Sequence, residues 1–562
     1  MAGQHDHEAA AVRANESGHE SGNEGNLAAD SSANKQKETL PKTSTHEHAP
    51  LETFIEVPEN DDTPVTSKWE IWSWYMYYVG ANGLSLFNFG PTAFQNLLSQ
   101  AAEPSGLLDF AGRKRDVNSI VLVCNGIAFA IQVVLFLLIG AYADFGTWRP
   151  YILLVWSIIA YGIGFGWIAV HDPENWRTGV GLYIVGIIAY QITLTYWTAA
   201  FPSLARNTQY LRDSRVAFRS GDISQQELDR RDEMERSRLS NESFWAQSVG
   251  EIVILAILVG VMFGVKVDDS VEKNNWGLSV AIVYSTACWL ALSIGWFVLE
   301  KKRPGMTVPP GLNIVTVGFW QLYEAGSQIW QLKQTVIFLI GYFWLGDSLN
   351  TTVTVIATLQ YQVVSYNTLT LTYMLIVGIF TQAVGIGGFW LLQKYFKISA
   401  KTMFIAVVIF IVLLDGWGMI GNWSDDFGFH STWEFWAYGA LYGLLVCPWY
   451  SYSQIMISSV TPRGYEFLFF SVFNIVGKSS SFVGPFISSA IIDDTPGGQN
   501  NNAAFYLFVA LSVLSLAFIW YFLDLEKSAR EQEAFLERKR AHMANMSSSL
   551  GVSGSMKKIE EP

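Results

Sequence analysis

The chain has 562 residues, of which 50% are hydrophobic, 15% aromatic and only 15% charged. Soluble chains carry about 25% charged residues, so this composition excludes an ordinary soluble protein and predicts a polytopic membrane protein. The formal net charge of −13 lies largely in polar tails and loops, and no basic patch suggests a nucleic-acid partner.

The first segment, residues 1–69, is polar and lacks the apolar core of a signal peptide, which predicts a disordered cytosolic tail. Five of the eight histidines lie there, and their irregular spacing favours a solvated tail over a metal-binding tract. The three cysteines, Cys124, Cys288 and Cys447, each lie inside an apolar run. We therefore expect neither a disulfide framework nor a metal site, and no cofactor.

A membrane-spanning helix needs about 20 mostly apolar residues, and about twelve such runs follow the tail. The first contains many polar residues and Pro91, so it is the weakest of the series. The twelve runs start near Trp72, Val117, Pro150, Gly179, Ser243, Trp276, Thr335, Asn367, Lys401, Thr432, Glu466 and Asn502.

The basic residues set the orientation. If the N-terminus is cytosolic, the cytosolic loops hold about seventeen Lys and Arg residues and the opposite loops about six. An even number of spans then places both tails, 1–69 and 525–562, in the cytosol. The six opposite residues are Arg113, Lys114, Arg115, Arg177, Lys266 and Lys273.

Two long cytosolic connections divide the chain. The loop 202–241 contains the charge-dense stretch ELDRRDEMERSRLS, which predicts a solvated helix. The linker 300–334 begins with Pro and Gly and ends with spaced aromatic residues, which fit either a helix on the membrane surface or an extension of the seventh span. It separates a six-helix half at 70–299 from a second at 335–524, an arrangement typical of secondary transporters.

The turn between the second and third spans, GAYADFGTWRP, predicts a tight cytosolic hinge. Gly140 and Gly146 allow close backbone approach and unusual dihedral angles. Asp144 and Arg149 must be solvated, paired with each other or paired with helix ends at the membrane edge. A simple solvated turn is the alternative interpretation.

Charges inside spans are candidates for function because they are costly there. Asp347 lies about twelve residues into the seventh span, near the membrane midplane. Asn350 and Thr351 share its helical face, which predicts a polar stripe along an aqueous cavity. Hydrogen bonding between helices without substrate is the alternative.

Lys478 lies at a similar depth in the eleventh span. It could form a buried structural ion pair with Asp347. Alternatively, a zwitterionic substrate separates the two, with its carboxylate on Lys478 and its ammonium on Asp347.

Three further features of the spans bear on mechanism. Glu251 in the fifth span could carry a coupled proton, or it could pair with a neighbouring helix. Asp415 sits nearer the far surface, and we assign it no role. Pro448, flanked by Tyr442 and Tyr450, could let the tenth span bend during gating.

Signatures of catalysis are missing from the sequence: it contains no GxSxG, HExxH or Walker loop and no His and Cys cluster, so we expect no enzyme and no catalytic residues. Asn422, in Asn-Trp-Ser, is a glycosylation candidate on the non-cytosolic side.

The turn GAYADFGTWRP resembles the loop between the second and third helices of major facilitator superfamily transporters, through Gly140, Ala143, Asp144, Gly146 and Arg149. The resemblance implies a gating role for Gly140, Asp144, Gly146 and Arg149. Thr147 and Trp148 depart from the pattern and leave one arginine where the family usually has a basic cluster.

Longer segments resemble fungal proteins of the autophagy-related protein 22 family, which are vacuolar amino-acid effluxers. The resemblance implies an all-α major facilitator fold in the vacuolar membrane and export of amino acids such as leucine to the cytosol after autophagic breakdown. The segments are EIWSWYMYYVGANGLSLFNFGPTAFQNLL, YADFGTWRP, YQITLTYWTAAFPSLARN, GDSLNTTVTVIATLQ and NIVGKSSSFVGP.

Taken together, these observations predict a secondary transporter of small solutes working by alternating access in the lipid bilayer. We expect Asp347, Asn350, Thr351 and Lys478 to bind substrate and Glu251 to couple protons. Two alternatives stay open: a cation-coupled sugar or other solute symporter, and a non-transporting receptor or scaffold that recruits partners through the loop 202–241.

Overall fold

A computed structural model describes residues 63–549. Short gaps interrupt this range at 103–106, 148, 268, 304, 306–307, 309–311, 314–315, 321–322, 324–328, 364–367, 425 and 494–499. Most of the predicted N-terminal tail, the end of the C-terminal tail and much of the linker 300–334 therefore lie outside the described residues.

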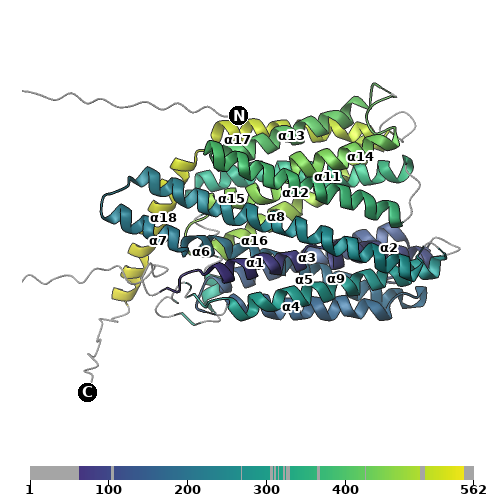
Figure 1. Ribbon diagram of the computed structural model, residues 1–562, viewed down its shortest axis with the longest axis horizontal. Helices are drawn as coiled ribbons and strands as arrows, with labels where there is room; N and C mark the ends of the chain where they lie inside the picture. Colours follow the sequence, from purple (N-terminus) through teal and green to yellow (C-terminus); the bar gives the residue numbers. More distant parts are fainter. Residues whose placement is uncertain are drawn as a thin grey trace, which may run out of the picture. The chain divides into compact units, whose positions relative to one another are not determined.

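Helices coincide with all twelve predicted runs (Figure 1). Nine helices of the described residues are long and apolar enough to cross a membrane. The other three runs contain a broken helix or are apolar over a shorter length. The helices of the first six runs are α1 Lys68–Gly80 with α2 Gly90–Ala101, α3 Val117–Ala143, α4 Arg149–Gly166, α5 Trp176–Ala199, α8 Gln225–Val265 and α9 Val271–Leu299.

The helices after the linker follow the same order along the chain. We call them the second set, and those from α1 to α9 the first set. The second set consists of α11 Lys333–Val363, α12 Thr368–Phe396, α13 Ala400–Ile420, α14 Thr432–Leu441 with α15 Trp449–Val460, α16 Glu466–Asp493 and α17 Phe505–Phe522.

Short elements fill the connections. The strands β1 Leu107–Phe110 and β2 Arg113–Asp116 form an antiparallel hairpin after α2, with Leu107 opposite Asp116. The short 3₁₀ turns are Trp167–Ala169, Pro173–Asn175, Ile329–Gln331 and Asn501–Ala504. The remaining helices are α6 Phe201–Arg206 and α7 Gln209–Arg219 before α8, and α18 Leu525–Ser549 after α17.

Two runs are interrupted by π-helical turns rather than continuous. The segment Leu84–Phe89 separates α1 from α2 and follows Gly83, whose φ of 95° is left-handed. The segment Tyr442–Val446 separates α14 from α15, and Cys447 and Pro448 follow it. Because π-helical turns within helices are frequent at functional sites, these two positions single out the first and tenth runs.

Local sequence signals explain where several helices begin. Ser67, Ser224 and Ser399 each accept a hydrogen bond from the backbone N–H three residues later, which satisfies an otherwise unpaired donor. Ser431 and Glu434 form a reciprocal capping box at the start of α14. These caps fix the positions at which the four helices begin.

The helix α8 begins at Gln225, well before the predicted start of the fifth span near Ser243. The predicted solvated helix is therefore the first part of this one long helix. It is also not fully solvated, because Glu235 and Ser237 are buried against other helices. Sequence reasoning separated the two segments because their compositions differ, although their helical backbone is continuous.

Packing within each set is extensive. In the first set α1 lies on α8 and α9, and α4 lies on α5 and α9. In the second set α11 lies between α16 and α17, and α13 lies on α15 and α17. The two sets meet where α8 contacts α12 and α15 and where α16 contacts α3 and α5.

Candidate functional site

The helices α6 and α7 lie at one end of the membrane-spanning helices, which we call the α6–α7 end. The turn between α3 and α4 lies at this end. Asp144 in this turn is fully buried. Its Oδ1 accepts a hydrogen bond from the backbone N–H of Phe467 at 3.1 Å, and its Oδ2 accepts one from Leu468 at 3.1 Å. The acceptor belongs to the first set and the donors to the first turn of α16 in the second, so the carboxylate joins the two sets.

The N-terminus of α16 carries partial positive charge and unpaired N–H groups, which by themselves favour the ionised form of Asp144. Burial raises the pKa of Asp144 to about 8, whereas the guanidinium of Arg149 and the two backbone donors act in the opposite direction. Of the pairings that the sequence allowed for Asp144, the structure therefore contains the one with a neighbouring helix end.

Arg149 holds the turn itself. Its Nε donates to the carbonyl oxygen of Ala143 at 2.9 Å, and its Nη2 donates to that of Asp144 at 3.3 Å. The guanidinium also lies 4.8 Å from the centre of the Phe467 ring. Nearby, the Arg206 guanidinium forms an ion pair with Glu466, which again joins the first set to the start of α16.

The two glycines of the turn have distinct roles. Gly140 lets α16 approach α3, because a Cβ there would lie 2.6 Å from Ser471 Oγ. Gly146 has a φ of 67°, a conformation that other residues adopt only with strain. Its carbonyl oxygen accepts a hydrogen bond of 2.7 Å from the N–H of Gly305, so the linker between the two sets rests on this turn.

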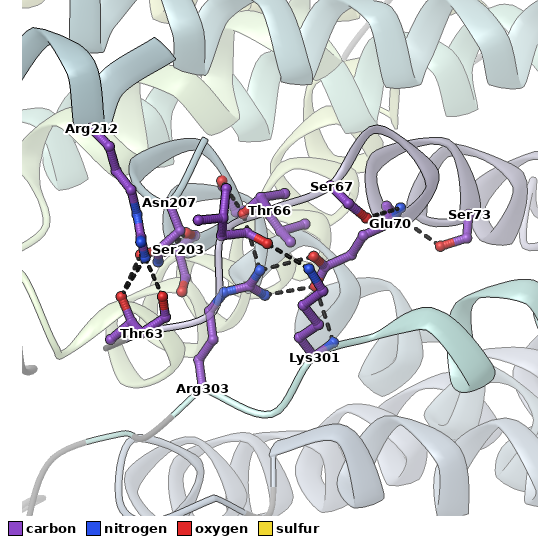
Figure 2. A network of polar contacts seen from close by, with 12 residues as sticks. Thr63, Thr66, Ser67, Glu70, Ser73, Ser203, Asn207, Arg212, Lys301 and Arg303 are labelled. Carbon is purple, nitrogen blue, oxygen red and sulfur yellow. Dashed lines mark hydrogen bonds and ion pairs between the residues drawn. The ribbon is translucent and has the colours of Figure 1, made fainter. Parts of the chain in front are cut away.

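A second network, shown in Figure 2, ties the linker to the start of α1. Glu70 is fully buried, and its two carboxylate oxygens accept from Arg303 Nη1 at 2.8 Å and Nη2 at 2.9 Å. The N–H of Lys301 donates to the same carboxylate at 3.0 Å. Arg303 also donates to Thr66, whose hydroxyl bonds the carbonyl of Leu204 in α6. This network links three separate segments of the α6–α7 end.

The first part of α8 joins the second set directly. Arg236 Nη1 donates to Ser458 and Ser459 of α15 at 3.2 and 3.1 Å. Gln393 of α12 donates to the hydroxyl of Ser237 at 3.2 Å. These bonds show why the charge-dense stretch is only partly solvated: it forms part of the contact between the sets.

Glu251 lies farther along α8, about 21 Å from Ser237 at 1.5 Å per residue. It is 4% exposed, and its carboxylate accepts a hydrogen bond from the side-chain amide of Gln247. Gln382 of α12 donates to Gln247 at 3.3 Å and to Ser248 at 2.8 Å. A chain of amides therefore connects Glu251 to the second set.

The predicted substrate residues lie within the second set. Asp347 and Thr351 of α11 are buried, and both face Gly484 of α16, where a Cβ would collide with Asp347 Oδ1 and Thr351 Oγ1. Asn350 is exposed, and its side-chain amide donates to the carbonyl of Gly477 at 3.3 Å. The structure thus brings Asp347, Asn350 and Thr351 to the contact between α11 and α16.

Lys478 also belongs to α16, the helix that packs against α11. The position of its side chain lies outside the described part of the structure. The predicted meeting of Asp347 and Lys478 therefore stays a prediction, with the two helices in contact.

Asp415 is a polar residue whose environment sequence reasoning missed. It is buried in α13, and its two carboxylate oxygens accept from the hydroxyls of Ser348 and Thr352 of α11, each at 2.9 Å. The signal was present in the sequence, because Ser348 and Thr352 are four residues apart and share one helical face. This site ties α11 to α13 within the second set.

The glycosylation candidate Asn422 lies after α13. Its side-chain Nδ2 donates to the carbonyl oxygens of Met419 at 3.0 Å and Asn502 at 2.8 Å. Attachment of a glycan to this nitrogen would replace one of its two hydrogens and so remove at least one of these bonds, and glycosylation stays an untested prediction.

Comparison with known proteins identifies the family. The model of the family described as "Vacuole effluxer Atg22 like" matches residues 66–533. The chain belongs to this family. Autophagy-related protein 22 of Yarrowia lipolytica is 23% identical over 515 residues, covering 81% of this chain and 84% of the relative. The protein of the same name from Kluyveromyces lactis is 26% identical over 426 residues, covering 74% and 77%.

Solved structures establish the fold. The major facilitator superfamily proton:xylose symporter XylE, bound to 6-bromo-6-deoxy-D-glucose, superposes with a TM-score of 0.56 at 11% identity, covering 83% of this chain and 98% of that chain. The predicted all-helical major facilitator fold is therefore confirmed, and its twelve spans correspond to the twelve helical runs. The chain is an Atg22-like membrane transporter rather than an enzyme.

Proposed function

We propose that this transporter exports neutral amino acids such as leucine from the vacuole lumen to the cytosol. The first and second sets would be its two six-helix halves, with the α6–α7 end and both tails in the cytosol. The excess of Lys and Arg at this end supports that orientation. The family match and its description as a vacuole effluxer support the direction and the compartment.

The observation that carries the proposal is the position of the contacts between the two sets. Asp144, Arg206 and the first part of α8 bond the second set at the α6–α7 end. Alternating access requires bonds at one end that can break while others form at the opposite end. In this structure the α6–α7 end is closed, which in the proposed orientation corresponds to a transporter closed toward the cytosol.

We propose that the solute binds between the sets near the membrane midplane. Asp347, Asn350 and Thr351 supply polar groups from α11, Lys478 belongs to α16, and a zwitterion offers complementary charges to Asp347 and Lys478. Glu251 carries the coupled proton in this proposal. Its burial and its amide chain to α12 support a role that senses the relative position of the sets.

The test is transport by the purified full chain in liposomes loaded with radiolabelled leucine, with glucose and xylose as competing classes of solute. We expect leucine efflux that depends on a pH gradient and is unaffected by the sugars. Efflux of a sugar alone would favour the symporter alternative, and no flux of any solute would favour the receptor or scaffold.

The site assignment is tested separately. Lys478→Ala and Asp347→Asn should abolish leucine efflux while the protein remains monodisperse. Asp269→Asn is the matched control, because this aspartate is exposed and pairs with Lys273 at the opposite end. Unchanged efflux in both site variants would remove these residues from the substrate site without affecting the assignment as a transporter.

A further inference from the structure

Glu251 is a buried carboxylate at the contact between the two sets. Its oxygen accepts from the amide of Gln247, which is itself neutral. Within the part of the chain that the structure describes, no Lys, Arg or His side chain forms an ion pair with Glu251. A buried carboxylate without a cation is costly, so a proton or a cation from outside the protein must neutralise it.

Among the described residues, the side chains that interact electrostatically with Glu251 are neutral. Tyr78 of α1, Tyr190 of α5, and Cys447 and Tyr450 beside Pro448 lie close enough to interact electrostatically with its carboxylate. From α12 the facing group is the amide of Gln382. Phenol, thiol and amide groups leave the negative charge of an ionised Glu251 uncompensated.

Aromatic rings continue from this site across both sets. Tyr78 stacks on Trp197 at 4.1 Å and meets the edge of Phe244 at 5.0 Å between ring centroids. Phe244 stacks in turn with Tyr450 of the second set at 6.3 Å. Tyr450 keeps 44% of its surface exposed. An accessible ring beside a buried carboxylate therefore lies where the two sets meet.

This combination of groups suits an ammonium ion. A carboxylate supplies a charged hydrogen-bond acceptor, and the face of a tyrosine ring attracts a cation within about 6 Å. Glu251 also faces both sets, whereas Asp347 lies against the backbone of α16 within one set. Glu251 is thus the carboxylate whose environment changes when the sets move relative to each other.

We infer that Glu251, rather than Asp347, binds the ammonium group of the transported amino acid together with the rings of Tyr78 and Tyr450, and that this ammonium and a proton occupy the carboxylate in turn. The inference rests on the proposed function and specifies its substrate chemistry. When the ammonium forms its ion pair, the proton on Glu251 leaves to the solution on the open side. When the amino acid departs, a proton returns, and the O–H bond of Glu251 is the only covalent bond that breaks or forms.

The experiment uses two probes that keep the branched alkyl side chain of leucine. 3-Methylbutylamine keeps the ammonium without the carboxylate, and 4-methylpentanoate keeps the carboxylate without the ammonium. Binding to the purified full chain is measured by calorimetry at several pH values. We expect the amine and leucine to bind, and the amine to weaken as pH falls, by up to about tenfold per pH unit once Glu251 is protonated.

Two variants sharpen this experiment. Glu251→Gln should weaken the binding of 3-methylbutylamine at least tenfold and remove its pH dependence, and Glu251→Asp should keep that pH dependence. Asp415→Asn is the matched control, because it removes another buried carboxylate, one that accepts hydrogen bonds from Ser348 and Thr352 within the second set. Thermal unfolding of each variant shows that it is folded.

Three outcomes would overturn the inference: amine binding that survives in Glu251→Gln, amine binding by the native chain that does not change with pH, or a strict requirement for sodium over potassium, which would assign the carboxylate to a metal ion. A failure of the proposed function would give a different result from these three outcomes. Amine binding lost in Glu251→Gln, together with no amino-acid flux by the native chain, would uphold the ammonium site and reject transport.

Discussion

The two ends of the helices differ in how the sets are joined. At the α6–α7 end, hydrogen bonds and ion pairs cross from one set to the other, as between Asp144 and the start of α16. At the opposite end, the networks of the described residues stay within one set. Asn275 of α9 bonds Asn96 and Gln100 of α2, and Glu434 caps α14.

The difference shows which bonds a conformational change must break. Bonds within a set can persist in every state of an alternating-access cycle, because each set moves largely as a rigid body. Bonds between the sets at the α6–α7 end must break before a solute can leave there. Substitutions at the two ends should therefore have separable effects on stability and on opening.

The largest effect is expected from Arg303→Ala. It leaves the fully buried carboxylate of Glu70 without its bidentate partner, and breaking a buried ion pair in this way costs about 3 to 5 kcal/mol. We expect a marked fall in the thermal unfolding temperature of the purified protein. Lys302→Ala is the neighbouring control, since Lys302 contacts Tyr151 at an exposed position. Equal unfolding temperatures for the two variants would contradict the structural role of the Glu70 network.

The second effect is on the opening of the α6–α7 end. Asp144→Ala removes two hydrogen bonds to the start of α16 and should weaken closure by about 2 kcal/mol, roughly a thirtyfold change in the equilibrium. A cysteine introduced by Ser471→Cys, which is buried against Gly140, reports the change through faster labelling by a membrane-impermeant maleimide. Asp269→Ala, at the opposite end, should leave the labelling rate unchanged. If both aspartate variants labelled alike, Asp144 would have no role in closure.

Much of the fold follows from the sequence, because hydropathy and helix length are local properties. The twelve runs and the turn from Gly140 to Arg149 are of this kind. The partner of Asp144 is not, since Phe467 is 323 residues away and no local pattern connects them. The sequence could only show that a charge at a membrane edge needs a helix end or a counter-charge.

The candidate site was less predictable for physical reasons. The two π-helical turns, Leu84–Phe89 and Tyr442–Val446, each add one residue to a helical turn, which apolar periodicity does not register. The polar stripe at Asp347 was visible as helical spacing. Which neighbour it faces depends on how α16 packs, and that is set by the whole second set. Glu251 was recognised as a buried charge, but its amide chain to Gln382 requires the contact of α8 with α12.

A smaller loss of stability is expected from a substitution at the opposite end of the helices. Glu434→Gln replaces one carboxylate oxygen, Oε2, that accepts from the N–H groups of His430 and Ser431 at 2.8 and 3.0 Å. An amide nitrogen there would face two donors, so the variant should lose about 1 to 2 kcal/mol of stability. The unfolding temperature should fall, but the labelling of Ser471→Cys should stay as in the native chain. Faster labelling would show that the two ends are coupled.

The last effect depends on pH and concerns the α6–α7 end. Burial, together with repulsion from Glu70, raises the pKa of Glu300 from 4.5 to about 8, against the opposing influence of Arg303 and Arg149. Between these two values the folded chain keeps a proton that the unfolded chain loses. Rising pH therefore lowers the free energy of unfolding by at most about 1.4 kcal/mol per pH unit, and the loss is complete above the folded pKa.

Glu300→Gln removes this titration and provides the test. The variant's advantage in unfolding temperature over the native chain should grow from about pH 5.5 to about pH 7.5 and level off above pH 8. Glu434→Gln, which leaves Glu300 intact, serves as the control and should show no such growth. A difference in unfolding temperature between Glu300→Gln and the native chain that stays constant across this pH range would mean that Glu300 keeps an ordinary pKa. The α6–α7 end would then tolerate the negative charge of Glu300 beside Glu70. A growing difference in unfolding temperature would mark Glu300, at the start of the linker, as one of the groups of the closed end that titrate near neutral pH.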